Sequence, residues 1–230
     1  MLFETEQRPS TVDFVSQIWH SRSIQNYEFT SVASCNMELV FSNYGGRRTV
    51  HLRGPESHPT QAECPLDGEW LGIQFRSGSF LPALACGVGA VDAGIELPNS
   101  ASGFWLQGAS WEYPTYDNID AFIGRIARSG LVQTDPIVND ALARNGSEAP
   151  NRSLQRRFLA VTGLSQTTLR QINRARAATV LLRQGDPIGD VAHQLGFYDQ
   201  AHLNRLLRRF IGHTPTRLQA QTSQPIVSII

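Results

Sequence analysis

Residues 186–217 read DPIGDVAHQLGFYDQAHLNRLLRRFIGHTPTR, and this stretch decides how the C-terminal part of the chain folds. Asp186 and Pro187 form a helix-start signal, because an Asp side chain accepts a free N–H of the first turn and proline fits that turn without losing a bond. Apolar residues at helical spacing follow until Gly196, which predicts the end of this helix. A second start signal lies at Asp199. The stretch therefore predicts two short helices around a glycine-centred turn.

The second helix, expected over residues 199–210, separates its side chains into two faces. The apolar face carries Leu203, Leu206, Leu207 and Phe210. The opposite face carries Gln200, Ala201, Asn204, Arg205 and Arg208. Glutamine and asparagine can pair with adenine, arginine can pair with guanine, and alanine can contact a thymine methyl group. A solvated surface helix would show a similar polar face, but two short helices around a tight turn favour DNA binding.

Two segments of this stretch closely resemble the signature of AraC/XylS-type transcriptional regulators. They are GFYDQAHLNR at residues 196–205 and RRFIGHTP at residues 208–215. Members of that family carry two helix-turn-helix units joined by a long helix, so the resemblance implies an upstream unit. The segment RSLQRRFLAVTGLS at residues 152–165 resembles the first recognition helix and the turn after it. The resemblance covers roughly residues 136–218 and implies a double helix-turn-helix DNA-binding domain.

The connecting helix is expected over residues 165–185, with Ser165 as its N-cap and Gly185 as its C-cap. Its apolar stripe consists of Leu169, Ile172, Ala175, Thr179 and Leu182. Before the first recognition helix the chain departs from the family pattern, because Pro150 stands where a capping serine is common. Residues 145–150 (NGSEAP) accordingly predict an irregular turn.

The resemblance, carried over by position, implies which side chains face the DNA. The base-facing candidates are Arg152, Gln155 and Arg156 in the first unit and Gln200, Ala201, Asn204 and Arg205 in the second. Arginines off these faces are expected at phosphates, where they set affinity rather than sequence choice. They are Arg174, Arg208, Arg209 and Arg217.

The distribution of charge agrees with a DNA-binding C-terminal half. The net charge of the whole chain is zero, which by itself argues against a nucleic-acid-binding protein. Residues 1–143, however, hold 8 Arg and 16 Asp+Glu, a net charge of −8. Residues 144–230 hold 12 Arg and 4 Asp+Glu, a net charge of +8. The basic half coincides with the predicted helix-turn-helix units, as attraction to phosphate requires.

The N-terminal half predicts antiparallel strands, because short alternating runs are separated by Gly, Pro and Asn clusters. The runs are Met37–Phe41, Thr49–Arg53, Leu71–Arg76 and Phe104–Trp111. From Asp117 the apolar spacing becomes helical as far as Gly130, and a further helix start lies at Asp135 and Pro136. In AraC-type regulators this half often holds a cupin-like or otherwise β-rich domain that senses a ligand and dimerises.

The predicted fold is therefore α+β, with a β-rich N-terminal domain followed by an all-α double helix-turn-helix domain. The expected limits are a β-rich domain at 1–116, a helical linker at 117–135, the DNA-binding domain at 136–220 and a C-terminal tail at 221–230.

The sequence predicts no catalytic residue, metal or cofactor. His51, Glu56 and His58 are the candidate metal ligands, but the paired-histidine spacing of a metal site is absent. The three cysteines also lack disulfide or zinc spacing, and small buried side chains in a reducing cytosol are the simpler interpretation for Cys35, Cys64 and Cys86. No signal peptide is visible, and the most apolar run, at 80–91, is shorter than the ~20 residues that span a bilayer. A cytoplasmic protein without membrane contact is expected.

The expected function is a sequence-specific DNA-binding transcriptional regulator rather than an enzyme. Its two recognition helices would enter successive major grooves about 34 Å apart. The expected partners are double-stranded DNA and, by resemblance, a second copy in a homodimer, a small-molecule effector and RNA polymerase. Two alternatives stay open. The β-rich half could be a metal-binding or small-molecule enzyme barrel with an accessory helical domain, or the chain could act through protein contacts after losing DNA binding, for which residues 145–150 are the hint.

Overall fold

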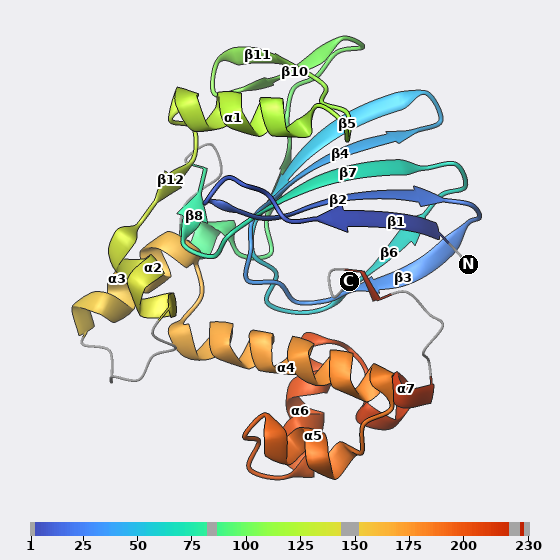
Figure 1. The fold of residues 1–230 in the computed structure, drawn as a ribbon, viewed down its shortest axis with the longest axis vertical. Helices are drawn as coiled ribbons and strands as arrows, with labels where there is room; N and C mark the ends of the chain where they lie inside the picture. The colour runs from blue at the N-terminus through green and yellow to red at the C-terminus, as the bar shows by residue number, and fades with distance from the viewer. Residues whose placement is uncertain (1–2, 82–86, 144–151, 221–225, 228–230) are drawn as a thin grey trace. The chain divides into compact units, whose positions relative to one another are not determined.

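The computed structural model describes residues 3–81, 87–143, 152–220 and 226–227 (Figure 1). The chain forms two compact units, each built from several segments of sequence. The first compact unit consists of Met1–Tyr27, Asn36–Pro55 and Cys64–Ser165. The second compact unit consists of Glu28–Cys35, Glu56–Glu63 and Gln166–Ile230.

The first compact unit is built on a six-stranded antiparallel sheet. Its strands, in spatial order, are β1 (Phe3–Arg8), β2 (Val15–Ser23), β7 (Glu69–Phe75), β4 (Glu38–Tyr44), β5 (Arg47–Arg53) and β9 (Gly94–Glu96). Ile18 and Leu39 both pair with Ile73, and Leu39 also pairs with Leu52, so one row of apolar side chains crosses four strands on the same face. The sheet begins at β1 and ends at β9. It is therefore open, and the closed barrel of a cupin is not formed by these six strands.

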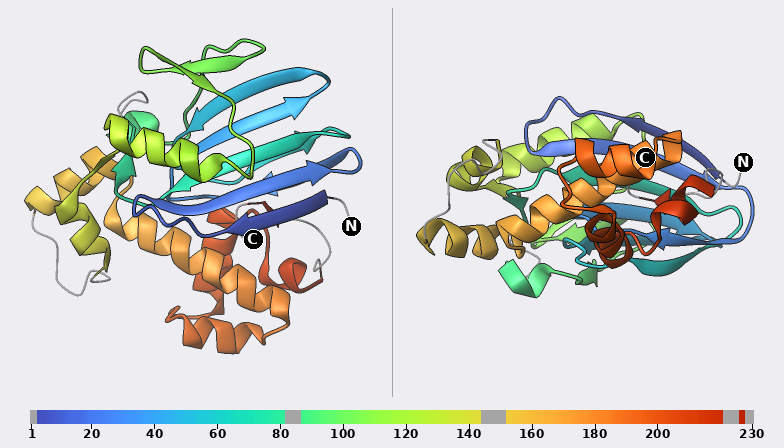
Figure 2. Two further views of the ribbon diagram at one scale, coloured as in Figure 1. Left: turned by 45° about the horizontal axis from the view of Figure 1, so that its top comes forward. Right: turned by 90° about the horizontal axis from the view of Figure 1, so that it is seen from below.

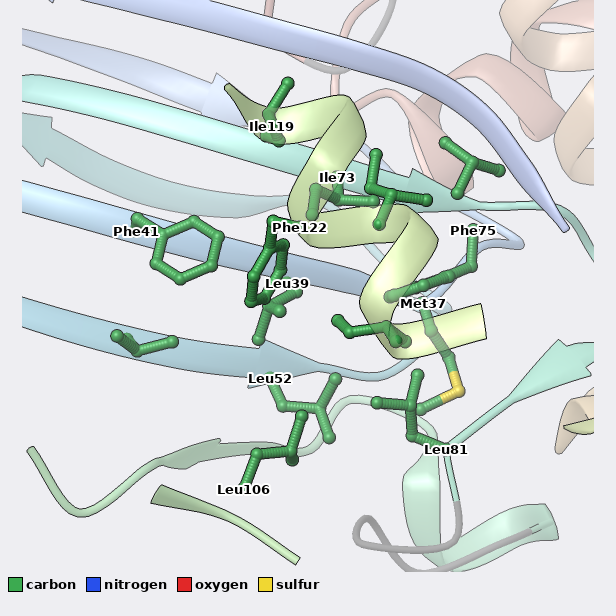
Figure 3. Close-up of a cluster of buried hydrophobic side chains, with 14 of the residues drawn as sticks. Met37, Leu39, Phe41, Leu52, Ile73, Phe75, Leu81, Leu106, Ile119 and Phe122 are labelled. Carbon is green, nitrogen blue, oxygen red and sulfur yellow. The ribbon is translucent and has the colours of Figure 1, made fainter. Parts of the chain in front are cut away.

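Helix α1 (Ile119–Ser129) covers the apolar face of this sheet (Figures 1 and 3). Its buried residues recur at helical spacing and pack among the sheet residues: Ile119, Phe122, Ile123 and Ile126. The Phe122 ring lies edge-on to the Phe41 ring, with centroids 5.7 Å apart. The segment 117–135, expected as a linker, thus supplies part of the core of the β-rich domain. The predicted helix end at Gly130 is confirmed, because this residue adopts the left-handed conformation with φ 69°.

Three of the predicted strands are present with small shifts in their ends, as β4, β5 and β7. The fourth run is a hairpin rather than one strand: β10 (Gly103–Leu106) pairs with β11 (Ala109–Glu112). Gln107 and Gly108 have positive φ angles of 49° and 79°, and a two-residue turn with two positive φ angles joins twisted antiparallel strands well. The alternation on both sides of this turn gave the run its strand-like pattern.

A small ribbon and two helices complete the first compact unit. The ribbon pairs β8 (Ser79–Phe80) with β12 (Gln133–Thr134). Helix α2 (Pro136–Ala143) follows β12 directly, and α3 (Arg152–Thr162) contacts α2, β8 and the 3-10 helix η1 (Gly87–Ala90). The helix predicted from Asp135 and Pro136 is confirmed as α2.

The second compact unit is mainly helical (Figure 2). It contains the long helix α4 (Gln166–Gln184) and three short helices that contact it: α5 (Ile188–Gln194), α6 (Gln200–Phe210) and α7 (Pro215–Ala220). The predicted connecting helix is confirmed as α4, which lies between Ser165 and Gly185. Every residue of its predicted apolar stripe is buried. The α+β fold, with a β-rich N-terminal part and a helical C-terminal part, is therefore confirmed.

Segments from the N-terminal half also belong to the second compact unit. Strand β3 (Tyr27–Ser31) lies between β6 (Thr60–Cys64) and β13 (Ile226–Val227) in a three-stranded sheet. The Ala33 N–H donates to the Phe210 carbonyl oxygen at 2.9 Å, and an Arg176 Nη1–H donates to the Ala33 carbonyl oxygen at 3.2 Å. Each compact unit thus contains several segments of the chain, whereas the sequence analysis expected a single boundary at 117–135. The domain limits given above stay a prediction.

Candidate nucleic-acid interface

The turn between α5 and α6 is closed by backbone hydrogen bonds around Gly196, which has φ 68°. The Gly196 N–H donates to the His193 carbonyl oxygen at 3.0 Å, and the Phe197 N–H donates to the Ala192 carbonyl oxygen at 2.8 Å. This pair of bonds is a Schellman motif, which satisfies carbonyl groups at the end of a helix. The glycine-centred turn predicted from the sequence is confirmed.

The two helices around this turn begin differently. At α6, Asp199 is extended and its Oδ1 accepts a hydrogen bond from the His202 N–H at 2.6 Å, so the predicted cap is confirmed. At α5, the N-cap residue is Pro187, and the predicted capping role of Asp186 is wrong. The Asp186 N–H donates to the Leu181 carbonyl oxygen at 3.2 Å. Pro187, with φ −58° and ψ 135°, is the non-helical residue directly before α5, so Asp186 lies one position outside the helix.

Helix α6 presents the two faces expected of it. The apolar residues Leu203, Leu206, Leu207 and Phe210 are buried. Gln200, Ala201, Arg205 and Arg208 are exposed, whereas Asn204 is half-buried. The Oδ1 atom of Asn204 is buried and lacks a hydrogen-bond partner among the described residues. In this side-chain position the buried Oδ1 atom is not accessible to a base edge, so the adenine contact predicted for Asn204 stays a prediction.

Arg174 of α4 supports the turn before α6. Its Nε–H donates to the Leu195 carbonyl oxygen at 3.0 Å, and its Nη2 group donates to the Gly196 carbonyl oxygen. The guanidinium carbon also lies 4.3 Å from the centroid of the Phe197 ring, within the range of a cation–π interaction. The phosphate contact predicted for Arg174 stays a prediction, but these bonds give the side chain a structural role as well.

The first helix-turn-helix unit consists of α2 and α3. Arg152, Gln155 and Arg156 lie exposed on α3, whereas Phe158 is buried. The Thr162 hydroxyl donates to the Phe158 carbonyl oxygen at 2.9 Å, and Gly163 with φ 72° follows the helix. Residues 144–151, for which the sequence predicts an irregular turn around Pro150, lie outside the described residues.

Asp135 connects the two helices of the first helix-turn-helix unit. Its Oδ1 accepts from the N–H groups of Ile137 and Val138 at 3.0 and 3.1 Å, which caps α2, and its Oδ2 accepts from Arg157 Nε of α3 at 2.6 Å. Burial alone would raise the pKa of this carboxyl group. The hydrogen bonds and the Arg157 charge outweigh burial, so the pKa of Asp135 is lowered below its ordinary value.

The remaining arginines with predicted phosphate contacts lie near the end of α6 and in α7. Arg208, Arg209 and Arg217 are all exposed. The Arg209 guanidinium lies 4.8 Å from the centroid of the Phe210 ring. The Thr214 hydroxyl accepts from the Arg217 N–H at 3.3 Å at the start of α7, so the loop after α6 ends in a capped helix.

Two side chains near these helices, Tyr198 and Arg157, and the bonds of a third, Arg174, were missed by the sequence reasoning. Tyr198 is 91% exposed directly before the cap of α6. Arg157 bonds to a carboxylate 22 positions earlier, and no local pattern marks such a pair. The carbonyl bonds of Arg174 could not be inferred either, because helical spacing places a residue on a face but does not name its partner in another helix.

The candidate metal ligands of the N-terminal half have other partners. His51 Nε2 lies 3.8 Å from Glu96 Oε2, whereas Glu56 Oε2 accepts from the Ser31 hydroxyl at 3.1 Å. Within the described ranges, there is no group of three or more His, Cys, Asp or Glu side chains that could hold a metal ion. None of the described helices combines the length and apolar character needed to cross a membrane.

Comparison with known proteins supports the helix-turn-helix assignment. Residues 148–221 match the family model described as "Helix-turn-helix domain", which confirms the predicted AraC-type domain. No curated protein sequence matches the chain.

Among solved structures, several of ToxT from Vibrio cholerae are similar to the chain. ToxT bound to (E)-4-(8-methylnaphthalen-1-yl)but-3-enoic acid is 10% identical, with a TM-score of 0.45 over 97% of this chain and 100% of that chain. ToxT bound to an unsaturated fatty acid is 12% identical, with a TM-score of 0.43 over 96% of both chains.

Proposed function

We propose that this chain, whose residues 148–221 are an AraC-type helix-turn-helix domain, is a transcription regulator that contacts DNA bases with α3 and α6. The observation that carries the proposal is the division of α6 into a buried apolar face and an exposed face of Gln200, Ala201 and Arg205. These side chain types match the donors, acceptors and methyl groups at the edges of bases in the major groove. The excess of arginine in residues 144–230 supports attraction to the phosphate backbone.

The division of roles follows from the positions of the side chains. The exposed residues near the N-terminal ends of α3 and α6 contact base edges, as in other helix-turn-helix proteins. Arg208, Arg209 and Arg217 contact phosphates and set the salt dependence of binding. Because a recognition helix fits one major groove, two such helices select two short sequence elements, which we call the α3 box and the α6 box. Their centres are separated by about one helical turn of DNA.

Selection of bound duplexes from a random pool tests the proposal directly. The full-length protein should enrich sequences with two conserved boxes whose centres are about 10–10.5 base pairs apart. The control is the Arg128→Ala variant, which changes an exposed arginine of α1 and should enrich the same sequences. Absence of any enriched sequence would favour the alternative of a regulator that acts through protein contacts.

The role of the β-rich half is also a proposal. A small-molecule effector, homodimer formation and contact with RNA polymerase remain predictions that rest on the family resemblance. The family match falls on the helical part of the chain and gives no support to the alternative of an enzyme with an accessory helical domain. Equilibrium sedimentation of the full chain, with and without a selected duplex, would test the homodimer.

A further inference from the structure

The first helix-turn-helix unit is joined to the ribbon of β8 and β12 by backbone pairing. Thr134 of β12 pairs with Ser79 of β8, and Gln133 pairs with Phe80. One residue further on, the Asp135 N–H donates to the Gly78 carbonyl oxygen at 3.2 Å. Because Asp135 also caps α2, the position of this helix is tied to the turn before β8.

Gly78 lies next to side chains of α2. Its φ is +90°, a conformation that favours glycine. A Cβ atom built at this position would lie 2.1 Å from Asn139 Oδ1 and 3.4 Å from Val138 Cγ1, and both of these residues belong to α2. The turn and the helix are therefore neighbours. An added methyl group at position 78 would displace the end of the Asn139 side chain, and at φ +90° it would also strain the turn.

The turn at Gly78 is itself fixed to the six-stranded sheet. The Arg76 N–H donates to the Phe14 carbonyl oxygen at 2.8 Å, and its Nε–H donates to the Val15 carbonyl oxygen at 3.2 Å. The Ser77 hydroxyl donates to Asn36 Oδ1 at 2.7 Å. The turn is therefore bonded to the start of β2 and to the segment directly before β4.

Asp135 carries this connection from α2 to the recognition helix α3. The Asp135 side chain is 11% exposed, and its Oδ2 accepts from Arg157 Nε at 2.6 Å. Arg157 follows Arg156 directly, and Gln155 and Arg156 are two of the base-facing candidates on α3. Rotation of α3 about its axis would break the bond to Arg157 and turn these two side chains away together.

We propose that Gly78, Asp135 and Arg157 are positioning residues through which the β-rich half sets the orientation of the first recognition helix. The inference rests on the proposed function, because it assumes that α3 contacts DNA. It follows that substitutions at these residues should affect recognition of the two boxes differently. Helix α3 shares a compact unit with the six-stranded sheet, whereas α6 belongs to the other unit. A change at these positions should therefore alter recognition of the α3 box and leave the α6 box as it is.

The test uses full-length variants and three duplexes: the selected site, the same site with the α3 box scrambled, and the site with the α6 box scrambled. The α3 box is identified as the one in which Arg156→Ala changes the base preference. Arg157→Gln should weaken binding to the selected site by about tenfold. On the duplex with the scrambled α3 box, Arg157→Gln and the wild type should bind equally, because this duplex no longer offers α3 its specific base contacts. Gly78→Ala should behave in the same way.

Matched controls separate this effect from general damage. Arg47→Gln removes an exposed ion pair in the same compact unit, in which Arg47 Nη2 lies 3.3 Å from Glu96 Oε1. Gly46→Ala places alanine at φ +76° where no atom lies within 4 Å of the added Cβ. Both controls should bind all three duplexes as the wild type does. Since Arg157 is half-exposed, Arg157→Gln should fold, so the test stands even if Gly78→Ala unfolds the protein.

The outcomes are distinct. The proposal is supported if Arg157→Gln loses discrimination at the α3 box alone. It is overturned if Arg157→Gln keeps the wild-type preference at that box, or if it weakens both boxes equally. If the wild-type protein binds the selected site and both scrambled duplexes equally, the proposed function fails. This result needs no variant, so it can be told apart from failure of the present proposal.

Discussion

Replacement of Arg174 by methionine tests the role that the structure gives to this side chain. The substitution keeps most of the apolar stem and removes the guanidinium group. It therefore deletes the bonds to the Leu195 and Gly196 carbonyl oxygens and the contact with the Phe197 ring. A hydrogen bond that involves a charged group contributes about 1.5–3 kcal/mol, and a cation–π contact contributes about 0.5–2 kcal/mol.

The expected loss is smaller than the sum of these contributions. Arg174 is half-buried, so water replaces part of what the guanidinium loses, and neighbouring interactions do not add. We expect the free energy of unfolding of the full chain to fall by about 2–3 kcal/mol. Urea denaturation measures this value, and hydrogen exchange at the Gly196 and Phe197 amides reports the opening of the turn.

Arg170→Met is the matched control, because Arg170 is an exposed arginine one turn earlier in the same helix. It should change the free energy of unfolding by less than about 0.5 kcal/mol. If Arg174→Met were equally mild, the hydrogen bonds to the turn would contribute nothing measurable, and the structural role of Arg174 would be refuted. A fall of about one in the salt slope of DNA binding, with unchanged stability, would instead assign Arg174 to phosphate contact alone.

Three further predictions concern the second compact unit. Asp199→Ala should lower the free energy of unfolding by about 1 kcal/mol, because the His202 N–H loses its acceptor, and urea denaturation checks this loss. Burial, followed by the Arg217 charge, lowers the pKa of His213, so the unfolded chain binds a proton more readily and the free energy of unfolding should decrease as the pH falls below about 6.5. Denaturation between pH 8 and pH 5 should show a flatter dependence for His213→Gln, and an unchanged slope would contradict the prediction. Arg217→Ala should weaken binding to all duplexes alike and reduce the salt slope by about one, whereas a loss confined to one base position would assign it to base contact.

Local signals in the sequence were sufficient for the helices of the second compact unit. The N-cap at Asp199, the left-handed glycine at position 196 and the buried stripe of α4 each depend on neighbours within one or two turns. The limit of this reasoning appears at the two Asp-Pro pairs. Asp135 caps its helix, but Asp186 does not, because Pro187 (φ −58°, ψ 135°) is itself the N-cap residue of α5 and leaves Asp186 one position outside it.

The arrangement of the β-rich half could not be predicted in the same way. Strand β2 pairs with β7, whose partner residues lie 47 to 60 positions later, and alternation within a run gives no information about its partner. Two segments of the N-terminal half, Glu28–Cys35 and Glu56–Glu63, belong to the compact unit of α4–α7. Their membership depends on long-range bonds such as that from the Ala33 N–H to the Phe210 carbonyl oxygen. Of the candidate site, the sequence identified which helices carry it and which faces are exposed, but not the contacts of Asp135, Arg157 and Arg174 that hold those helices in position.

The most direct test of a regulator with two recognition helices compares base preferences in three proteins. These are the wild type, Arg156→Ala and Arg205→Ala, each measured on every single-base variant of the selected site. Each variant should lose about 1–3 kcal/mol of discrimination at one position. The affected positions should lie in different boxes, whose centres are about 10–10.5 base pairs apart. Loss of discrimination in the same box for both variants, or in neither box for Arg205→Ala, would contradict the account.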